Sequence, residues 1–125
     1  MNENKYDVIV IGAGPAGYPA SIRAAQNGLT VACVDEWKNR DGSHSYGGTC
    51  LNAGCIPSKA LLESSELYSR SRSGFKEHGV VIDKVGLDLK VMQARKGNIV
   101  RQLTRGIETL LKSNGVEAIR GHGRL

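Results

Sequence analysis

The feature that most constrains the fold is an apolar run followed at once by three closely spaced glycines. Residues 6–12 read YDVIVIG, and such a continuous, β-branched run is typical of a parallel strand buried on both faces. The alanine-rich segment after it favours a helix over residues 14–27, and Gly28 stands where a helix commonly ends. A second apolar run, LTVACVD, ends at Asp35. This order of strand, turn, helix and strand predicts a right-handed βαβ unit.

The three glycines, Gly12, Gly14 and Gly17, fit the pattern G-x-G-x-x-G in the strand-turn-helix context that a dinucleotide site requires. The first glycine makes the sharp turn, the second lets the backbone approach a pyrophosphate, and the third lets the helix pack close to the strand. Asp35 ends the second strand near the usual offset of about 20 residues, where an acid binds ribose hydroxyls. The motif predicts a dinucleotide site but leaves NAD and FAD both open, and a turn that serves packing alone is the alternative. Pro19 predicts a local bend early in the helix.

The second informative feature is a pair of cysteines, Cys50 and Cys55, in the segment GGTCLNAGCIPSKALL. A structural zinc site usually takes two such pairs, and this chain adds only Cys33, in an apolar strand, and three scattered histidines. We therefore expect no metal, and we expect Cys33 to be a small buried residue. A disulfide is the better interpretation. In an ideal helix residues five apart have Cα atoms about 8–9 Å apart, and a disulfide tolerates about 7 Å, so the segment must be distorted beside Gly54.

A disulfide that closes so short a loop stabilises a protein little and is comparatively easy to reduce. In a reducing compartment such a bond is usually catalytic or redox-sensing. A helix is expected over residues 57–70, with Pro57 in its first turn. The positive end of that helix would favour the thiolate form of Cys55, and Lys59 adds a cation one turn away. The pair is therefore predicted to be redox-active.

The rest of the chain predicts one long helix and further strand material. VVID at residues 80–83 is expected to be a weak strand or edge segment. Asp88 is expected to be the N-cap of a helix that reaches Ser113, and residues 116–120 are a third strand candidate. The buried face of the long helix is expected to carry Ile99, Leu103, Ile107 and Leu110.

Together these elements predict an α/β, doubly wound, Rossmann-like fold with a parallel sheet. We expect the strands at 6–11, 30–35 and 116–120 to be parallel neighbours, with the helix at 14–27 on one face. A chain of 125 residues makes one domain at most. Because it ends as it enters strand-like sequence, we expect the domain to be incomplete at its C-terminus.

Composition and charge exclude some classes of function. The formal net charge is +5, but the basic residues are spread around the long helix, and the chain has only one Phe, one Trp and four Tyr to stack on bases. We therefore expect no nucleic-acid partner and a solvated or intramolecular basic face. The sequence has no apolar run of the ~18 residues that a membrane span needs, and no basic leader, so we expect a cytoplasmic protein without membrane contact.

The combination of DVIVIGAGPAG and GGTCLNAGCIPSKALL resembles the N-terminal part of the flavin-dependent pyridine nucleotide–disulfide oxidoreductases. The resemblance extends over essentially the whole chain, including VVIDKVGLDL and GIETLLKSNGVEAIRGHG. The sequence Ile56-Pro57-Ser58-Lys59 favours the branch that acts on lipoamide. Glutathione reductases typically have Val-Pro-Lys-Lys there, whereas mercuric reductases differ less, usually by Val at the position of Ile56.

The resemblance implies FAD at the first glycine turn and assigns a role to each matching residue. Cys50 would be the interchange thiol that reacts with the substrate, and Cys55 would be the thiol that faces the flavin. Lys59 would lie near the flavin and tune it. Asp35 would bind the adenosine ribose, where many family members have Glu. The cofactor-binding residues implied are Gly12, Gly14, Pro15, Ala16, Gly17, Asp35, Gly48, Thr49 and Lys59.

Members of this family are several times longer than this chain. The resemblance therefore implies that residues 1–125 are the N-terminal portion of an FAD-binding domain, without the NAD-binding and dimerisation domains. In the family the dimerisation domain supplies a His-Glu pair to the partner subunit's disulfide. His44, His78 and His122 do not match that histidine, and we expect all three in loops.

The activity implied for the full-length parent is oxidation of dihydrolipoamide by NAD, through FAD and the Cys50–Cys55 disulfide. The parent would be a homodimer, and its partner would be a lipoyl-bearing protein of a 2-oxo acid dehydrogenase or glycine cleavage complex. We expect the short chain to be inactive alone. Three alternatives stay open: a non-catalytic flavin- or nucleotide-binding module, a small thiol-redox protein without flavin, and another family member such as a mercuric or glutathione-type reductase.

Overall fold

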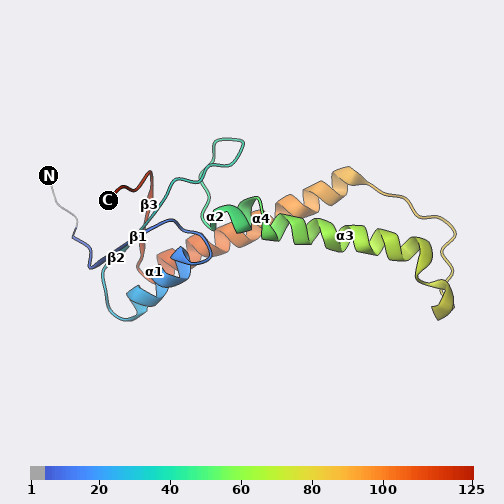
Figure 1. Ribbon diagram of the computed structural model, residues 1–125, viewed down its shortest axis with the longest axis horizontal. Coiled ribbons are helices and arrows are strands. Elements are labelled where there is room, and N and C mark those ends of the chain that lie inside the picture. Colours follow the sequence, from blue (N-terminus) through green and yellow to red (C-terminus); the bar gives the residue numbers. More distant parts are fainter. Residues whose placement is uncertain (1–4) are drawn as a thin grey trace.

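The computed structural model describes residues 5–125, as a small sheet at one end of the molecule and a long helical hairpin that projects from it (Figure 1). In chain order the elements are β1 (Val8–Ile11), α1 (Gly17–Gln26), β2 (Val31–Asp35), α2 (Gly48–Asn52), α3 (Cys55–Ser73), the 3-10 helix η1 (Lys76–His78), α4 (Leu89–Ser113) and β3 (Glu117–Arg120). The chain is an α/β protein, as predicted.

The sheet has three parallel strands in the order β1-β2-β3, which confirms the predicted neighbours. Val8 is in register with Val31, and Val34 is in register with Ile119. The carboxyl ends of all three strands therefore meet at one edge of the sheet. In an open parallel sheet this edge is where ligands bind.

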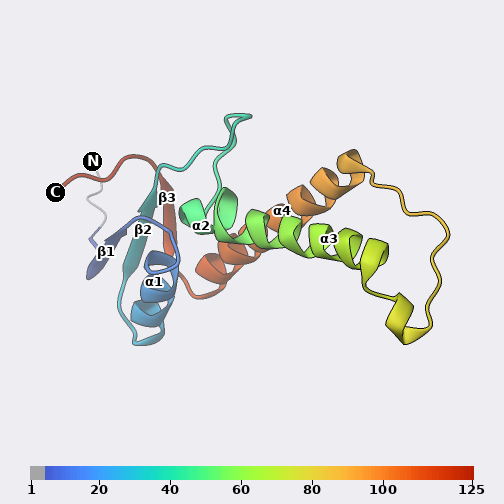
Figure 2. The same cartoon turned by 45° about the vertical axis from the view of Figure 1, so that its right-hand side comes forward.

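One face of the sheet carries the core. Helix α1 packs on β1 and β2, and α4 packs on β3 and α1 (Figure 2). Between them lies a buried cluster: Ala13, Val31, Cys33, Tyr46, Ile107, Leu111 and Val116. The prediction that the first strand is buried on both faces was wrong, because Ile9 and Ile11 are 59% and 49% exposed. Those side chains alternate to the opposite face of the sheet, away from α1 and α4.

Helix α1 begins at Gly17, three residues later than the predicted start at residue 14. The intervening residues form the glycine turn. Pro19 consequently lies in the first turn of the helix, where backbone N–H groups have no partner within the helix. The proline therefore removes no helical hydrogen bond, and the sequence can carry it there at little cost.

Helices α3 and α4 pack side by side as a hairpin (Figure 1). Arg95 of α4 joins them, because its guanidinium donates to Glu63 Oε2 at 2.6 Å and to the Ala60 carbonyl at 3.0 Å. Neither helix is long and apolar enough to cross a membrane, and the same holds for every other helix in residues 5–125.

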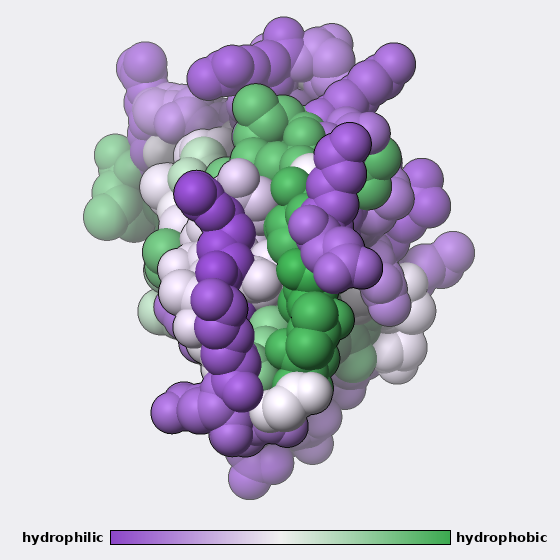
Figure 3. Space-filling view, turned by 90° about the vertical axis from the view of Figure 1, so that its right-hand side faces the viewer, coloured by the Kyte–Doolittle hydropathy of each residue, from purple (hydrophilic) through white to green (hydrophobic). Residues whose placement is uncertain are grey.

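The prediction of a strand at residues 80–83 was wrong, since this segment belongs to the irregular connection at the far end of the hairpin. A strand needs a neighbour to pair with, and the sheet lies at the opposite end of the molecule (Figure 1). The side chains of Val80, Val81 and Ile82 are 48%, 84% and 41% exposed. Figure 3 views this end of the molecule, where apolar surface lies between hydrophilic side chains.

The predicted buried face of α4 was right in part. Ile107 is buried as expected, but Leu103 and Leu110 are 41% and 48% exposed, and Leu111 is fully buried in place of Leu110. In a helix with 3.6 residues per turn, Leu103 and Leu110 lie together on one side of the stripe through Ile107 and Leu111. Of these α4 side chains, only Ile107 and Leu111 belong to the buried core cluster.

Asp88 is the N-cap of α4, as predicted, because its carboxylate accepts a hydrogen bond from the Val91 N–H at 3.0 Å. Replacing Asp88 by alanine should lower the free energy of unfolding by about 1 kcal/mol. Asp88→Ser, which keeps a capping oxygen, should restore most of that loss. Urea denaturation followed by circular dichroism measures both, and equal stability of the alanine and serine variants would contradict the assigned cap.

Candidate functional site

The glycine turn joins the carboxyl end of β1 to the start of α1. Gly12 has a φ of +97°, and its N–H donates to the Val34 carbonyl of β2 at 2.7 Å. A Cβ atom on Gly17 would lie 1.7 Å from the Gly12 carbonyl oxygen. The sharp turn predicted at Gly12 and the close approach predicted at Gly17 are both confirmed. Only glycine adopts the first conformation freely, and only glycine leaves room at the second position.

Asp35 holds the end of β2 against this turn. One carboxylate oxygen accepts a hydrogen bond from the Ala13 N–H at 2.6 Å, and the other accepts from the Trp37 N–H at 2.8 Å. The acid is therefore fixed by backbone donors on both sides. A carboxylate has about four acceptor positions, so two remain for a ligand.

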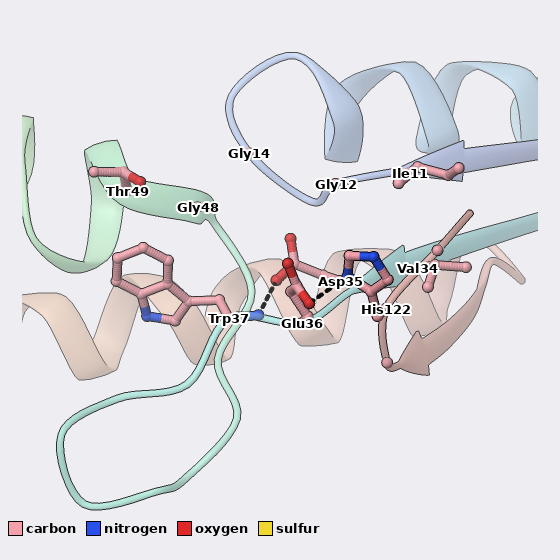
Figure 4. A pocket seen from close by; sticks show the side chains of 12 residues that line it. Ile11, Gly12, Gly14, Val34, Asp35, Glu36, Trp37, Gly48, Thr49 and His122 are labelled. Atoms are coloured by element: carbon pink, nitrogen blue, oxygen red, sulfur yellow. Dashed lines mark hydrogen bonds and ion pairs between the residues drawn. The ribbon is translucent and has the colours of Figure 1, made fainter. Parts of the chain in front are cut away.

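A cavity of about 350 Å³ lies at the carboxyl edge of the three strands (Figure 4). It is formed by the ends of β1 and β2, the segment that follows β3 and the start of α2. Its lining consists of Ile11, Gly12, Gly14, Val34, Asp35, Glu36, Trp37, Gly48, Thr49, Gly121, His122 and Gly123. The structure thus brings five of the predicted cofactor-binding residues to one cavity: Gly12, Gly14, Asp35, Gly48 and Thr49. Pro15, Ala16, Gly17 and Lys59 are outside this lining.

The sequence interpretation missed seven lining residues, and three of these have aromatic or charged side chains: Glu36, Trp37 and His122. Each follows a strand at the carboxyl edge of the sheet, and that position was the available signal. Figure 4 shows Glu36 and His122 side by side, and His122 Nδ1 lies 2.6 Å from Glu36 Oε2. Of the other histidines, His44 lies in the loop after β2, whereas His78 ends the short helix η1 and was wrongly expected in a loop.

A contact between two glycines joins the turn to the segment that carries the cysteines. Gly48 begins α2 with a φ of +63°, and a Cβ atom on it would lie 2.8 Å from the Gly14 Cα atom. The two backbones can approach this closely because Gly48 has no side chain to collide with Gly14. Gly48 and Thr49 therefore line the same cavity as the glycine turn, and Cys50 follows Thr49 directly.

Cys50 and Cys55 form a disulfide, with their Cα atoms 4.7 Å apart. This is far shorter than the ideal helical separation, so the predicted distortion is confirmed. Helix α2 ends at Asn52 and α3 begins at Cys55. At the junction Gly54 donates to the Thr49 carbonyl at 2.7 Å, and a Cβ atom on Gly54 would lie 3.3 Å from the Cys50 Cα atom. The missing side chain lets the chain fold back onto Cys50.

Helix α3 begins at Cys55, two residues earlier than predicted, so Cys55 is its first residue. The backbone N–H groups of the first turn carry partial positive charge, which favours a thiolate at this position. Lys59 lies one turn further along α3, on the same face, and is exposed. Cys55 is itself exposed, whereas Cys50 is half-buried.

Two titratable side chains are buried beneath the site. Burial raises the pKa of the Cys33 thiol, and a hydrogen bond with Ser21 opposes this only in part. Cys33 is fully buried, as predicted. Burial also raises the pKa of the Tyr46 hydroxyl, against the opposing effect of Arg120. Both groups are uncharged near neutral pH. Within residues 5–125, no three His, Cys, Asp or Glu side chains are grouped as a metal site would require.

Comparison with known proteins decides the family. The family profile described as pyridine nucleotide-disulphide oxidoreductase matches residues 6–125. The chain belongs to this family. Similar proteins include one from Arabidopsis thaliana, named "dihydrolipoyl dehydrogenase 1, mitochondrial". It is 48% identical to this chain over 118 residues. Dihydrolipoyl dehydrogenase 3 of Pseudomonas aeruginosa is 51% identical over 121 residues, and leghemoglobin reductase of Vigna unguiculata is 47% identical over 118.

The alignments cover 94%, 96% and 94% of this chain, respectively. They cover only 22%, 24% and 21% of the three relatives. The chain therefore spans less than a quarter of the length of these oxidoreductases. The glycine turn and the cysteine segment both lie inside the matched region.

Proposed function

We propose that this chain is the N-terminal part of an FAD-dependent dihydrolipoyl dehydrogenase, with the Cys50–Cys55 disulfide as its redox centre. The observation that carries the proposal is the packing of Gly14 on Gly48. It brings the glycine turn and the two residues that precede Cys50 to one cavity, so a dinucleotide bound there would lie next to the disulfide segment. The names of the similar proteins, two of them dihydrolipoyl dehydrogenases, support the substrate class.

The residues present fit FAD. Gly14 lines the cavity without a side chain, so its backbone can approach a pyrophosphate there. Gly48 also lacks a side chain, which leaves room for Gly14 beside it. The ten-residue helix α1 points its unpaired N–H groups toward the same turn, with Pro15 and Ala16 between them. Asp35 keeps acceptor positions for ribose hydroxyls. When bound, FAD supplies the route by which a pair of electrons passes between the cysteines and NAD.

The cysteines would perform thiol–disulfide exchange with the substrate. A thiolate of dihydrolipoamide attacks Sγ of Cys50, the Cys50–Cys55 bond breaks, and Cys55 leaves as a thiolate. The second thiolate of the substrate then attacks the substrate sulfur bonded to Cys50, which closes the lipoamide ring and releases Cys50. The substrate loses two electrons and two protons, and the protein disulfide gains the electrons.

The position of Cys55 suits its role as the leaving thiolate. The N-terminus of α3 stabilises negative charge on its sulfur, and a more stable thiolate leaves faster. Lys59 adds a positive charge on the same face of the helix. We assign Cys50 to the substrate and Cys55 and Lys59 to the flavin side.

The complete enzyme would also need an NAD-binding domain and a dimerisation domain. We propose that it acts as a homodimer on a lipoyl-bearing protein of a 2-oxo acid dehydrogenase or glycine cleavage complex. A reducing, cytoplasmic compartment agrees with a disulfide that is cycled during turnover.

A single substitution tests the cofactor site without disturbing the fold. A Cβ atom on Gly14 would have the Gly48 Cα atom as its nearest neighbour, 4.0 Å away, so Gly14→Ala should fold normally. The new methyl group would occupy the approach to the pyrophosphate. We expect the Kd for FAD to rise about ten-fold or more, measured by quenching of flavin fluorescence.

The matched control is Gly86→Ala, because a Cβ atom there meets nothing within 4 Å and the residue lies in the distal connection. Its affinity for FAD should equal that of the unmodified chain. Equal affinity of the Gly14→Ala variant would remove the glycine turn from the cofactor site.

A further inference from the structure

We propose a second binding site, for a small phosphorylated compound, in a groove between the loop at residues 39–45 and the middle of α4. This loop follows β2 and stands out from the molecule near α2 (Figure 1). Two adjoining hollows of about 440 and 280 Å³ make up the groove. They share Asn39, Ser43, Ser45, Arg101 and Thr104. None of their lining residues belongs to the cavity at the sheet edge, so the proposal is independent of the FAD site.

The groove is lined by four cations: Arg40, Lys96, Arg101 and Arg105. Two acids also line it, but both are already engaged. Asp41 accepts hydrogen bonds from the N–H and the hydroxyl of Ser43, and Glu108 forms an ion pair with Arg120 at 3.2 Å. Among residues 5–125, none of the four cations has a carboxylate oxygen within 4.0 Å. Positive charges gathered around a hollow raise the electrostatic potential inside it, which attracts an anion.

The loop is already organised by its own hydrogen bonds. The Asn39 amide donates to Ser43 Oγ at 3.1 Å, and the Ser45 hydroxyl donates to Asn52 of α2 at 2.9 Å. These contacts use the polar groups of the loop and leave the charged N–H groups of Arg40 and Arg105 for an external acceptor. His44 Nδ1 is buried in the same loop without a partner among residues 5–125. Such an atom is usually satisfied by an ordered water or ion.

The chemistry of the lining favours phosphate over an acidic protein segment. A guanidinium group presents parallel N–H donors that match two oxygens of a phosphate. The groove has walls on both sides, formed by the loop and by α4. Protein interfaces are built around apolar and aromatic anchors. Here Val100 and Tyr46 are the apolar and aromatic lining residues, and Tyr46 is only 5% exposed.

Isothermal titration calorimetry of the 125-residue chain with inorganic pyrophosphate, at constant ionic strength, tests the proposal. The groove variant is Arg101→Gln/Arg105→Gln. The matched control is Lys90→Gln/Lys112→Gln, which also removes two positive charges from α4 but at positions outside the lining. We expect the groove variant to bind pyrophosphate about ten-fold more weakly or worse, and the control to bind within about two-fold of the unmodified chain.

Arg101 and Arg105 line the groove, whereas Lys90 and Lys112 do not. All four side chains are exposed, so both variants should fold, which circular dichroism checks. Equal weakening in the two variants would show only a response to net charge and would overturn the site. The absence of binding to the unmodified chain would overturn it as well. A glutamate-rich peptide that binds more tightly than pyrophosphate, and only when Arg101 and Arg105 are present, would overturn the small-molecule assignment in favour of a protein partner.

Discussion

Dihydrolipoamide should no longer reduce this chain once Cys50 or Cys55 is replaced by serine. In the unmodified chain the disulfide should open under anaerobic conditions and release two thiols that react with Ellman's reagent. A serine at either position removes the bond that the substrate attacks. In a full-length enzyme that carries this segment, the same variants should lose turnover of dihydrolipoamide by about a thousand-fold or more.

The control for the cysteine variants is Cys33→Ala. Cys33 is fully buried and burial raises the pKa of its thiol, so it is neither accessible nor ionised near neutral pH. The alanine variant should therefore react with dihydrolipoamide as the unmodified chain does. FAD binding should survive in both serine variants. Normal turnover in either of them would remove the disulfide from the mechanism.

Replacing Gly17 by alanine should cause a large loss of stability, because no other glycine of the chain would bring a Cβ atom so close to another atom. The added Cβ atom would lie 1.7 Å from the carbonyl oxygen and 2.9 Å from the carbonyl carbon of Gly12. Both neighbours are backbone atoms, so α1 must move away from β1. We expect the free energy of unfolding to fall by about 3 kcal/mol or more.

Gly106→Ala is the matched control for Gly17→Ala. Gly106 lies within α4, and a Cβ atom there meets nothing within 4 Å. Because glycine is a poor helix former, this variant should be more stable by about 0.5–1 kcal/mol. Urea denaturation of the two variants in parallel measures the difference. Similar stabilities would contradict the close approach of α1 to the end of β1.

The parts of the structure that were predictable from the sequence are those with local causes. The βαβ unit follows from apolar runs and from glycines at Gly12 and Gly17, whose roles depend on backbone a few residues away. The distorted turn between Cys50 and Cys55 follows from their spacing and from Gly54. The cap at Asp88 likewise depends on one side chain and one nearby N–H group.

The features that were not predictable depend on contacts between distant segments. Residues 80–83 have a strand-like composition, but no local rule reveals that the sheet lies at the other end of the molecule. Whether Leu110 or Leu111 is buried depends on how α4 is rotated about its axis against the core. Glu36 and His122 meet although 86 positions separate them, since parallel strands bring their carboxyl ends to one edge. For that reason the sequence revealed the glycine turn but missed more than half of the residues that line the cavity.

The absorption spectrum of the 125-residue chain, after incubation with FAD and gel filtration, tests the central claim most directly. If the glycine turn, Asp35 and the start of α2 form a flavin site, the flavin bands should elute with the protein at about one FAD per chain. A folded chain that elutes without colour would contradict the claim that these residues bind FAD.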